Sequence, residues 1–337
     1  MRKAAFMLLS VLVIAMALSL TFCIPSGLVT EEAQSRYTDA AYAEEESAAK
    51  LKPVAVLAAN AVFSDILPAA NIDPLALDIA TPGSTPIEAN FTATGYRDDS
   101  IIVEMEKQRL YDSDVFVAYV KIATPSQLRT AIAGTKLTST RTNHPTQLSE
   151  NYNAIVAING DYYPNTKGGY VVRQGESCRT KTSANLDLLF IDELGDFHLL
   201  PRGNENQKNA IEAFQSAHEL VNGFFFGPAL VIDGKAQEIP ENYEFAPTAK
   251  NPRAAIGQIG PLTYAMVAVN GRTDASAGVT MKQLADIMEQ IGCQQAYNLD
   301  GGNSATLVFH GAMFNDKPQA ERAVTDIIYF ASATDAK

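Results

Sequence analysis

The chain contains many short apolar runs, rich in β-branched and aromatic residues and separated by Gly, Asn and Asp, and few segments with a helical period. Residues 114–122 and 263–269 are typical of buried strands. Residues 188–191 and 198–200 flank Gly195 and predict a pair of strands. Strands therefore outnumber helices and form both hairpins and strand–helix–strand units. This pattern predicts an α+β or mixed α/β fold, with a twisted, mixed β-sheet flanked by helices in a single domain.

Capping residues mark two helices. One begins after Thr280, which forms a capping box with Gln283, and ends at Gly292. Four apolar side chains of this helix lie on one stripe, suited to packing on a sheet: Leu284, Ile287, Met288 and Ile291. The same signals predict a second helix between Thr124 and Gly134, with Pro125 at its first position and Gln127 completing a capping box.

The first 96 residues resemble an export segment and a tether. Arg2 and Lys3 precede the uncharged, apolar residues 4–25, which is the pattern of an export signal. Two outcomes fit: cleavage at an A-x-A site, residues 41–43, or retention of residues 1–25 as an N-terminal membrane anchor. Either outcome places the protein outside the cytoplasm, secreted or anchored, with membrane contact only through the N-terminal segment. Residues 26–96 predict a tether and an N-terminal elaboration, and the domain is expected over residues 97–334.

Charge and motif content exclude several classes of function. The net charge of -12 argues against nucleic acid as a partner, because phosphate backbones require a basic surface. A small phosphate-bearing substrate stays compatible, since it requires only a few Arg, Lys or backbone N–H groups. The four histidines lack zinc-site spacing, and neither Gly-x-Ser-x-Gly nor a phosphate-binding loop occurs. Cys178 and Cys293 are compatible with a disulfide or with two buried thiols.

The most informative segment is the end of a predicted strand at residues 298–306. Because strands have a period of two, Asn298 and Asp300 share one face. Gly301 and Gly302 follow, and paired glycines allow close approach by a ligand. A hairpin turn explains the glycines equally well, but it does not explain the cluster of short polar side chains around them. That cluster includes Ser304 and Thr306.

Other candidate residues lie at other strand ends. Asn159, Gly160 and Asp161 repeat the pattern, and Asp161 is a candidate acid, base or metal ligand or the start of an Asx-turn. Arg253 and Arg272 are suited to bind a phosphodiester, although surface salt bridges are the commoner role for a single Arg. Glycosidic cleavage commonly uses two carboxylates, and three are candidates: Asp161, Glu176 and Asp300.

Taken together, these segments resemble the phosphodiester glycosidase family, the domain of N-acetylglucosamine-1-phosphodiester α-N-acetylglucosaminidase and of bacterial proteins linked to exopolysaccharide metabolism. The resemblance covers roughly residues 97 to 331 and is most specific in Asn-Leu-Asp-Gly-Gly at 298–302 with the Thr-capped helix before it. The other matching pieces run in the family's order: residues 157–163, 169–176, 227–234, 252–257, 270–286, 315–318 and 321–324.

The resemblance implies a hydrolase that cleaves a sugar from a sugar-1-phosphodiester on cell-surface or extracellular glycans. No cofactor is implied, and a divalent cation at Asp161 or Asp300 is left open. Asp300 would act at the anomeric centre, with Asp161 and Glu176 as the other catalytic candidates. The resemblance assigns the remaining residues to substrate binding: Arg253 and Arg272 on phosphate; Asn159, Asn298 and Ser304 on sugar hydroxyls; Gly160, Gly301, Gly302 and Thr306 around them.

Two positions depart from the family pattern. Asn270 replaces the usual Asp of Asp-Gly-Arg, and Asn303 replaces a third Gly. The first change removes a carboxylate and favours an alternative: a non-catalytic, cell-surface glycan-binding module of the same fold. A further alternative is a structural envelope protein whose glycine-rich turns are only hairpins. That alternative predicts that Asp300 and Arg253 do not converge in space.

Overall fold

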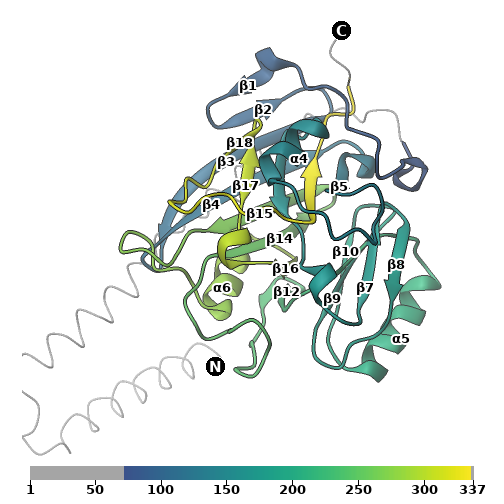
Figure 1. The fold of residues 1–337 in the computed structure, drawn as a ribbon. Helices are drawn as coiled ribbons and strands as arrows, with labels where there is room; N and C mark the ends of the chain where they lie inside the picture. The colour runs from purple at the N-terminus through teal and green to yellow at the C-terminus, as the bar shows by residue number, and fades with distance from the viewer. Residues whose placement is uncertain (1–71, 335–337) are drawn as a thin grey trace, which may run out of the picture. The chain divides into compact units, whose positions relative to one another are not determined.

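The computed structural model describes residues 72–334, which form three β-sheets with helices on their outer faces (Figure 1). The expected signal or anchor, residues 1–25, and most of the tether lie outside the described residues. No helix within residues 72–334 is long and apolar enough to cross a membrane. Every strand pair among the described residues is antiparallel, so the α+β class fits and the expected mixed sheet is wrong.

The largest sheet has nine strands, in the spatial order β1 (Phe91–Thr92), β2 (Gly95–Arg97), β3 (Ile101–Leu110), β4 (Ser113–Ile122), β15 (Thr263–Val269), β14 (Arg253–Gly260), β16 (Gln295–Leu299), β12 (Ala229–Ile232) and β13 (Lys235–Ala236). One five-stranded sheet has the order β10 (Phe197–Leu200), β9 (Leu188–Asp192), β11 (Leu220–Phe225), β7 (Tyr170–Arg173) and β8 (Glu176–Thr180). The other has the order β18 (Ala312–Met313), β17 (Leu307–Phe309), β6 (Val156–Asn159), β19 (Asp326–Phe330) and β5 (Leu128–Ile132).

The main hydrophobic core lies where the three sheets meet. It takes Ile256 from the nine-stranded sheet and Phe224 and Ile158 from the two smaller sheets, all fully buried. Three α-helices cover the outside: α4 (Pro145–Asn151), α5 (Asn204–Gln215) and α6 (Met281–Ile291). Short 3-10 turns join the strands: η1 (Pro74–Ala76), η2 (Glu88–Asn90), η3 (Pro125–Gln127), η4 (Tyr163–Asn165) and η5 (Gly302–Ser304).

The helix at residues 281–291 is confirmed, with its capping box and the left-handed Gly292 at its end. Its predicted stripe is buried and packs on β12 and β14. The helix predicted after Thr124 is wrong. The Gln127 side chain does accept hydrogen bonds from the Ala123 and Thr124 N–H groups. The turn ends there, however, because the next five residues are buried and pair with β19 as strand β5. Pairing with a distant strand outweighs the local capping signal.

The chain after β16 changes sheets. β16 pairs with β14 and β12, whereas β17 pairs with β6 and β18 in another sheet. The glycines between them, Gly301 and Gly302, therefore do not close a hairpin, and the hairpin interpretation of this segment is wrong. They carry the chain from one sheet to the next, and this crossing point is where the candidate site lies.

The described part of the N-terminal elaboration joins the main sheet. β1 pairs with β2 and β2 with β3, so the sheet already begins at Phe91. Ser84 forms an isolated bridge with Ser332 near the C-terminal end of the described chain. Cys178 is half-buried and Cys293 is buried, and both are free thiols.

Candidate active site

Asp300 lies on the wall between two cavities. The smaller, of about 270 Å³, is lined by the end of β6, the loop before β19 and the turn after β16. The larger, of about 540 Å³, is lined by residues 245–253, Arg272 and the same turn. Asp300 and Arg322 line both cavities. Asp300 and Arg322 can therefore contact a ligand in either cavity.

Asn159 fixes the backbone of the Asp300 turn. Its Nδ2 donates to the carbonyl of Asp300 at 2.8 Å and to that of Gly160 at 3.0 Å, and its Oδ1 accepts from the N–H of Thr306 at 3.1 Å. Asn159 is fully buried, so protein groups rather than water satisfy its side-chain amide. The residue thus joins the end of β6 to both ends of the turn that carries Asp300.

Three predicted glycines allow close contacts in this region. A Cβ on Gly301 would lie 2.8 Å from the Pro252 carbonyl, and one on Gly160 would lie 2.4 Å from Asp326 Oδ2. Gly302 has a φ of +60°. Its missing Cβ leaves room beside Arg272, whose guanidinium nitrogens would lie 3.4 Å away. Side chains at these positions would clash or strain the backbone, which explains the glycines without a ligand.

Arg253 and Arg272, the two residues predicted to bind phosphate, both line the larger cavity. Arg253 is 3% exposed and donates to four backbone carbonyls, those of Val279, Phe245, Ala246 and Ala249. Burial, with a smaller contribution from the charge of Arg272, lowers the pKa of Arg253 to about 10. Among the described residues no carboxylate forms an ion pair with Arg253. A buried cation held only by carbonyls favours an anionic ligand.

Arg272 is exposed and lies in the left-handed region, with a φ of +63°. Its Nε and Nη2 both donate to Asn251 Oδ1, at 3.1 and 2.9 Å. Asn251 also lines the larger cavity, so the guanidinium is oriented along the cavity wall rather than free in solvent.

Arg322 is a site residue that was not among the predicted ones. It lies in the loop before β19, and its guanidinium carbon is 5.7 Å from the centre of the Tyr162 ring. The segment 321–324 was matched to the family, but a single Arg in a loop carries no sequence signal for a site. Arg322 is a candidate site residue only because it lines both cavities.

The environment of Asp300 shifts its ionisation. Burial raises the pKa of Asp300, and the charge of Asp161 adds to this rise. A hydrogen bond with the Ser304 side chain and the charge of Arg322 oppose it. Ser304 is 1% exposed and lines the smaller cavity beside Asp300. A carboxylate with a raised pKa in a cleft is typical of an acid–base group.

Asp161 lines the smaller cavity but is held by other groups. Its Oδ1 accepts from Arg173 Nη2 at 2.8 Å and from the Tyr163 N–H at 3.2 Å, and its Oδ2 accepts from the Phe225 N–H at 2.8 Å. Arg173 also pairs with Asp326 at 2.8 Å, and all three charged side chains are fully buried. Burial raises the pKa of Asp161 against the charge of Arg173. These contacts engage both oxygens of Asp161 in a buried charge cluster with Arg173 and Asp326.

The other predicted residues do not line either cavity. Asn298 is fully buried and donates to the Gly227 carbonyl at 2.7 Å. Thr306 is buried and accepts from Lys317 Nζ at 2.8 Å. Glu176 is exposed on the edge strand β8. The departure from the family pattern, Asn270, is buried with its Oδ1 accepting from Asn315 Nδ2 at 3.1 Å. These side chains therefore support the site or lie away from it.

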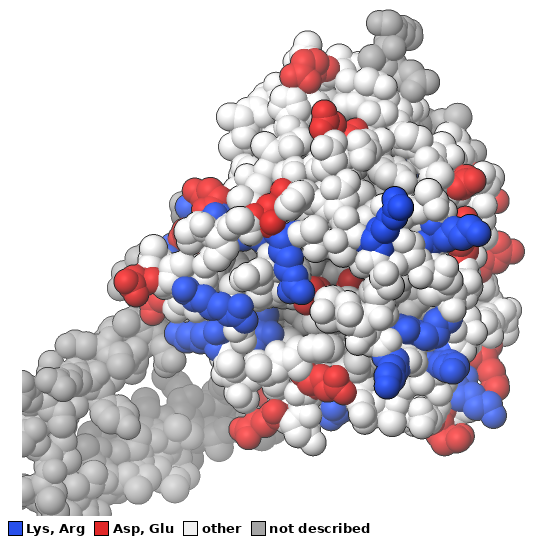
Figure 2. Space-filling view, viewed as in Figure 1, with Lys and Arg blue, Asp and Glu red and all other residues white. Residues whose placement is uncertain are grey.

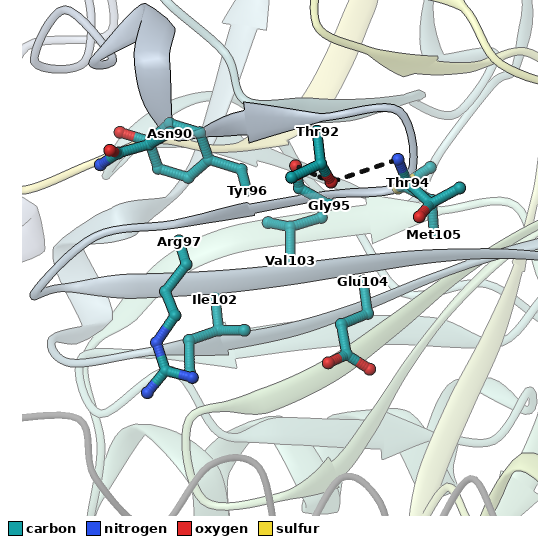
Figure 3. A pocket seen from close by; sticks show the side chains of 10 residues that line it. All are labelled: Asn90, Thr92, Thr94, Gly95, Tyr96, Arg97, Ile102, Val103, Glu104 and Met105. Carbon is teal, nitrogen blue, oxygen red and sulfur yellow. Dashed lines mark hydrogen bonds between the residues drawn. The ribbon is translucent and has the colours of Figure 1, made fainter.

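One face of the molecule carries many basic side chains although the chain is acidic overall. The face drawn in Figure 2 carries several Lys and Arg side chains near its centre, with acidic atoms visible between them. A separate hollow of about 370 Å³ lies on β1–β3, where Arg97 and Glu104 point to the same side of the sheet (Figure 3). None of its lining residues belongs to the two cavities beside Asp300.

The fold is an antiparallel α+β fold in which Asp300 lies between an arginine-lined cavity and a cavity lined by hydroxyl groups. Comparison with known proteins identifies the family. The family model described as phosphodiester glycosidase matches residues 152–331. The chain therefore belongs to the phosphodiester glycosidase family.

Individual relatives are distant. The chain resembles the catalytic domain of zebrafish N-acetylglucosamine-1-phosphodiester α-N-acetylglucosaminidase, solved in a form auto-inhibited by its pro-peptide. The TM-score is 0.54 at 16% identity, over 74% of this chain and 87% of that one. At this identity the likeness shows the fold alone. A hypothetical protein from Synechocystis matches with a TM-score of 0.48 at 17% identity, over 69% of this chain and 62% of that one.

One curated protein is similar in sequence. It is the SPbeta prophage-derived uncharacterized protein YomE of Bacillus subtilis (strain 168), 34% identical over 108 residues. The match covers 32% of this chain and only 17% of the length of YomE.

Proposed function

We propose that this protein hydrolyses sugar-1-phosphodiesters, releasing the sugar and leaving a phosphomonoester. The observation that carries the proposal is the position of Asp300 and Arg322 on the wall shared by the two cavities, with Arg253 and Arg272 in the larger one. Three arginines and the accessible carboxylate of Asp300 give this pocket a net positive charge. A net positive charge suits the single negative charge of a phosphodiester.

The two cavities suit the two halves of such a substrate. The smaller one offers Ser304, Thr140, Thr142 and Asn165, whose hydroxyl and amide groups suit sugar hydroxyls, and Tyr162, whose ring suits a sugar face. The larger one offers the arginines for the phosphate and room for the group attached to it. In this arrangement the anomeric carbon lies at the shared wall, beside Asp300. Asn159 and Asn298, first expected to hold sugar hydroxyls, instead hold backbone carbonyls.

The proposed step needs one carboxylate. Water adds to the anomeric carbon, the bond from that carbon to the phosphate oxygen breaks, and its electron pair stays on the phosphate. Arg322, Arg272 and Arg253 stabilise that charge, so the leaving group requires no proton from an acid. Asp300, ionised, accepts the proton of the attacking water and stabilises the positive charge that develops on the sugar. Asp161 and Glu176 have no part in this step.

The alternative of a non-catalytic glycan-binding module rested on Asn270. Its Oδ1 accepts from Asn315 Nδ2 in a buried contact, so an Asp at this position would also face Asn315 rather than the substrate. Asp300 and Arg253 line one cavity. A purely structural role does not explain why these two residues lie together. The first point removes the observation that favoured a binding module, and the second favours a ligand site over a purely structural role. With the export expected from residues 1–25, we propose extracytoplasmic glycans as the source of the substrate.

The test measures release of phosphomonoester from a panel of sugar-1-phosphodiesters by the full chain. Asp300→Asn should lower turnover by about 10²–10⁴-fold, the usual loss for an acid–base group. Asp99→Asn, an exposed acid outside both cavities, is the matched control and should keep full turnover. Circular dichroism checks that both variants are folded. If the folded wild type binds glycans saturably and releases no product from any diester, the protein is a binding module and the proposal is wrong.

A further inference from the structure

Two histidines and an aspartate meet at one end of the β9–β10 hairpin, away from the proposed active site. Asp192 ends β9, His198 lies in β10, and His218 lies in the connection from α5 to β11. Asp192 Oδ2 is 2.9 Å from His198 Nε2 and 3.1 Å from His218 Nδ1. One potential ligand atom from each residue lies within 4.8 Å of the others. None of the three residues lines the cavities beside Asp300.

The Asp192 carboxylate is oriented by the backbone. Its Oδ1 accepts from the N–H groups of Leu194 at 2.9 Å and Asp196 at 2.8 Å, and the side chain is fully buried. These hydrogen bonds leave Oδ2 facing the two imidazoles. Metal-binding carboxylates are commonly held in this way by hydrogen bonds to the oxygen that does not bind the ion.

The two imidazoles are held against each other. The ring of Phe214 on α5 lies 5.0 Å from the His198 ring and 5.5 Å from the His218 ring, and the two imidazole rings are 4.7 Å apart. Figure 1 shows α5 along the outside of the sheet that contains β9 and β10. Packing on one aromatic ring restricts both histidines to orientations that point to Asp192.

His198 Nε2 forms a hydrogen bond with Asp192 Oδ2 at 2.9 Å, but the hydrogen bonding of the other histidine is incomplete. His218 Nδ1 is buried and, among the described residues, has no hydrogen-bonding partner, although Asp192 Oδ2 is only 3.1 Å away. The contact is close, but its direction is wrong for a hydrogen bond. A cation bound by both atoms requires this closeness without that direction, since each ligand atom then points to the ion instead of to the other atom.

We propose that Asp192, His198 and His218 bind one divalent transition-metal ion of the zinc class. Two imidazole nitrogens and one carboxylate oxygen are ligands that such ions prefer. The His198 and His218 side chains are 31% and 30% exposed, so the remaining coordination positions face water. Glu193 lies at this edge, with its Oε1 3.9 Å from His218 Nδ1. The ion would join β9, β10 and the segment that leads into β11.

The site has a role separate from hydrolysis. None of the three metal-binding residues lines the cavities beside Asp300. The proposed ion therefore stabilises the five-stranded sheet. A ligand that binds only the folded state stabilises it by an amount that grows with the logarithm of its concentration relative to its Kd, and so raises the melting temperature. The sequence spacing hides this site, because the ligands come from a strand end, the next strand and a connection 20 residues later.

The test titrates Zn²⁺ into the full, untagged chain after removal of metal with EDTA. We expect one tight equivalent by calorimetry, a rise in melting temperature, and visible d–d absorption when Co²⁺ replaces Zn²⁺. His198→Gln and His218→Gln should each weaken Zn²⁺ binding at least about tenfold and remove the rise. Both variants keep Asp192, whose backbone hydrogen bonds support the fold.

The matched control is His310→Gln, which removes a histidine paired with one carboxylate, Glu88, at 3.0 Å. It should bind one equivalent of Zn²⁺ as the wild type does. Equal Zn²⁺ binding by the wild type and by His218→Gln would overturn the proposal, and so would a wild type that takes up no Zn²⁺. The readouts do not depend on hydrolysis, so this result and that of the diester assay are independent.

Discussion

Asn159 Nδ2 lies 2.8 Å from the carbonyl oxygen of Asp300, a contact between residues 141 positions apart in the chain. It connects the end of a strand in one sheet to the turn that leaves another. The position of the Asp300 carboxylate between the two cavities therefore depends on a buried amide that touches no substrate. This relationship makes Asn159 a positioning residue, and its loss is the first prediction.

Replacing Asn159 by Ala should lower both stability and turnover. The substitution leaves the Thr306 N–H and the Asp300 carbonyl buried without a partner, which costs about 1–3 kcal/mol per group. Urea denaturation and diester hydrolysis measure the two effects. Asn151→Ala, an exposed position at the end of α4, is the control and should change neither. Full turnover in Asn159→Ala would show that the turn keeps its geometry without the amide.

Replacing Arg322 by Met should move the pH profile of hydrolysis. The charge of Arg322 opposes the rise that burial causes in the pKa of Asp300. Without that charge the pKa of Asp300 rises further, and because the ionised form is the active one, the acidic limb of kcat/KM moves to higher pH. Arg97→Met, outside both cavities, should leave the limb in place. If the acidic limb of kcat/KM does not move in Arg322→Met, the ionisation of Asp300 does not set that limb.

Replacing Arg173 by Met should destabilise the fold severely, by about 3–5 kcal/mol, because it leaves Asp161 and Asp326 buried without their cation. Adding Asp326→Asn removes one of the two uncompensated charges and should recover part of this loss. Denaturant unfolding of the two single variants and the double variant gives the coupling energy. Additive losses would show that Arg173 and Asp326 are not energetically coupled.

Asp98 should contribute stability that depends on pH. Burial tends to raise its pKa, but hydrogen bonds from Ser332, Ser100 and Tyr96 outweigh burial and hold the pKa below its usual value. A folded-state pKa below the unfolded value of about 3.9 gives stability that is present above that pH. This stability is lost as the pH falls through the lower folded-state pKa.

The prediction is that Asp98→Asn is less stable than the wild type at pH 6 and that the difference shrinks below pH 4. Urea unfolding midpoints across that range measure it. Asp99→Asn, at the exposed neighbouring position, should follow the wild type at every pH. A constant difference between Asp98→Asn and the wild type would mean that Asp98 acts through packing rather than through its charge.

The sequence by itself determined the local elements with strong internal signals. The helix at 281–291 was predictable because its caps and its apolar stripe agree, and strands such as β4 and β15 were predictable because long runs of β-branched residues suit little else. The turn at Asp300 was also predicted as a site, because short polar groups around paired glycines exceed what a turn needs; the structure places Asp300 between two cavities, and its catalytic role stays a prediction.

The tertiary structure decided which residues distant in the sequence contact one another. Strand β5 forms where capping predicted a helix, because pairing with β19 stabilises it. Asp161 and Arg253 are engaged by a buried Arg and by backbone carbonyls, and neither contact follows from local sequence. Arg322, His198 and His218 gain their importance only from neighbours far along the chain. Local energies fix helices and strands, but contacts between distant segments depend on how the sheets pack, and a single sequence does not record that packing.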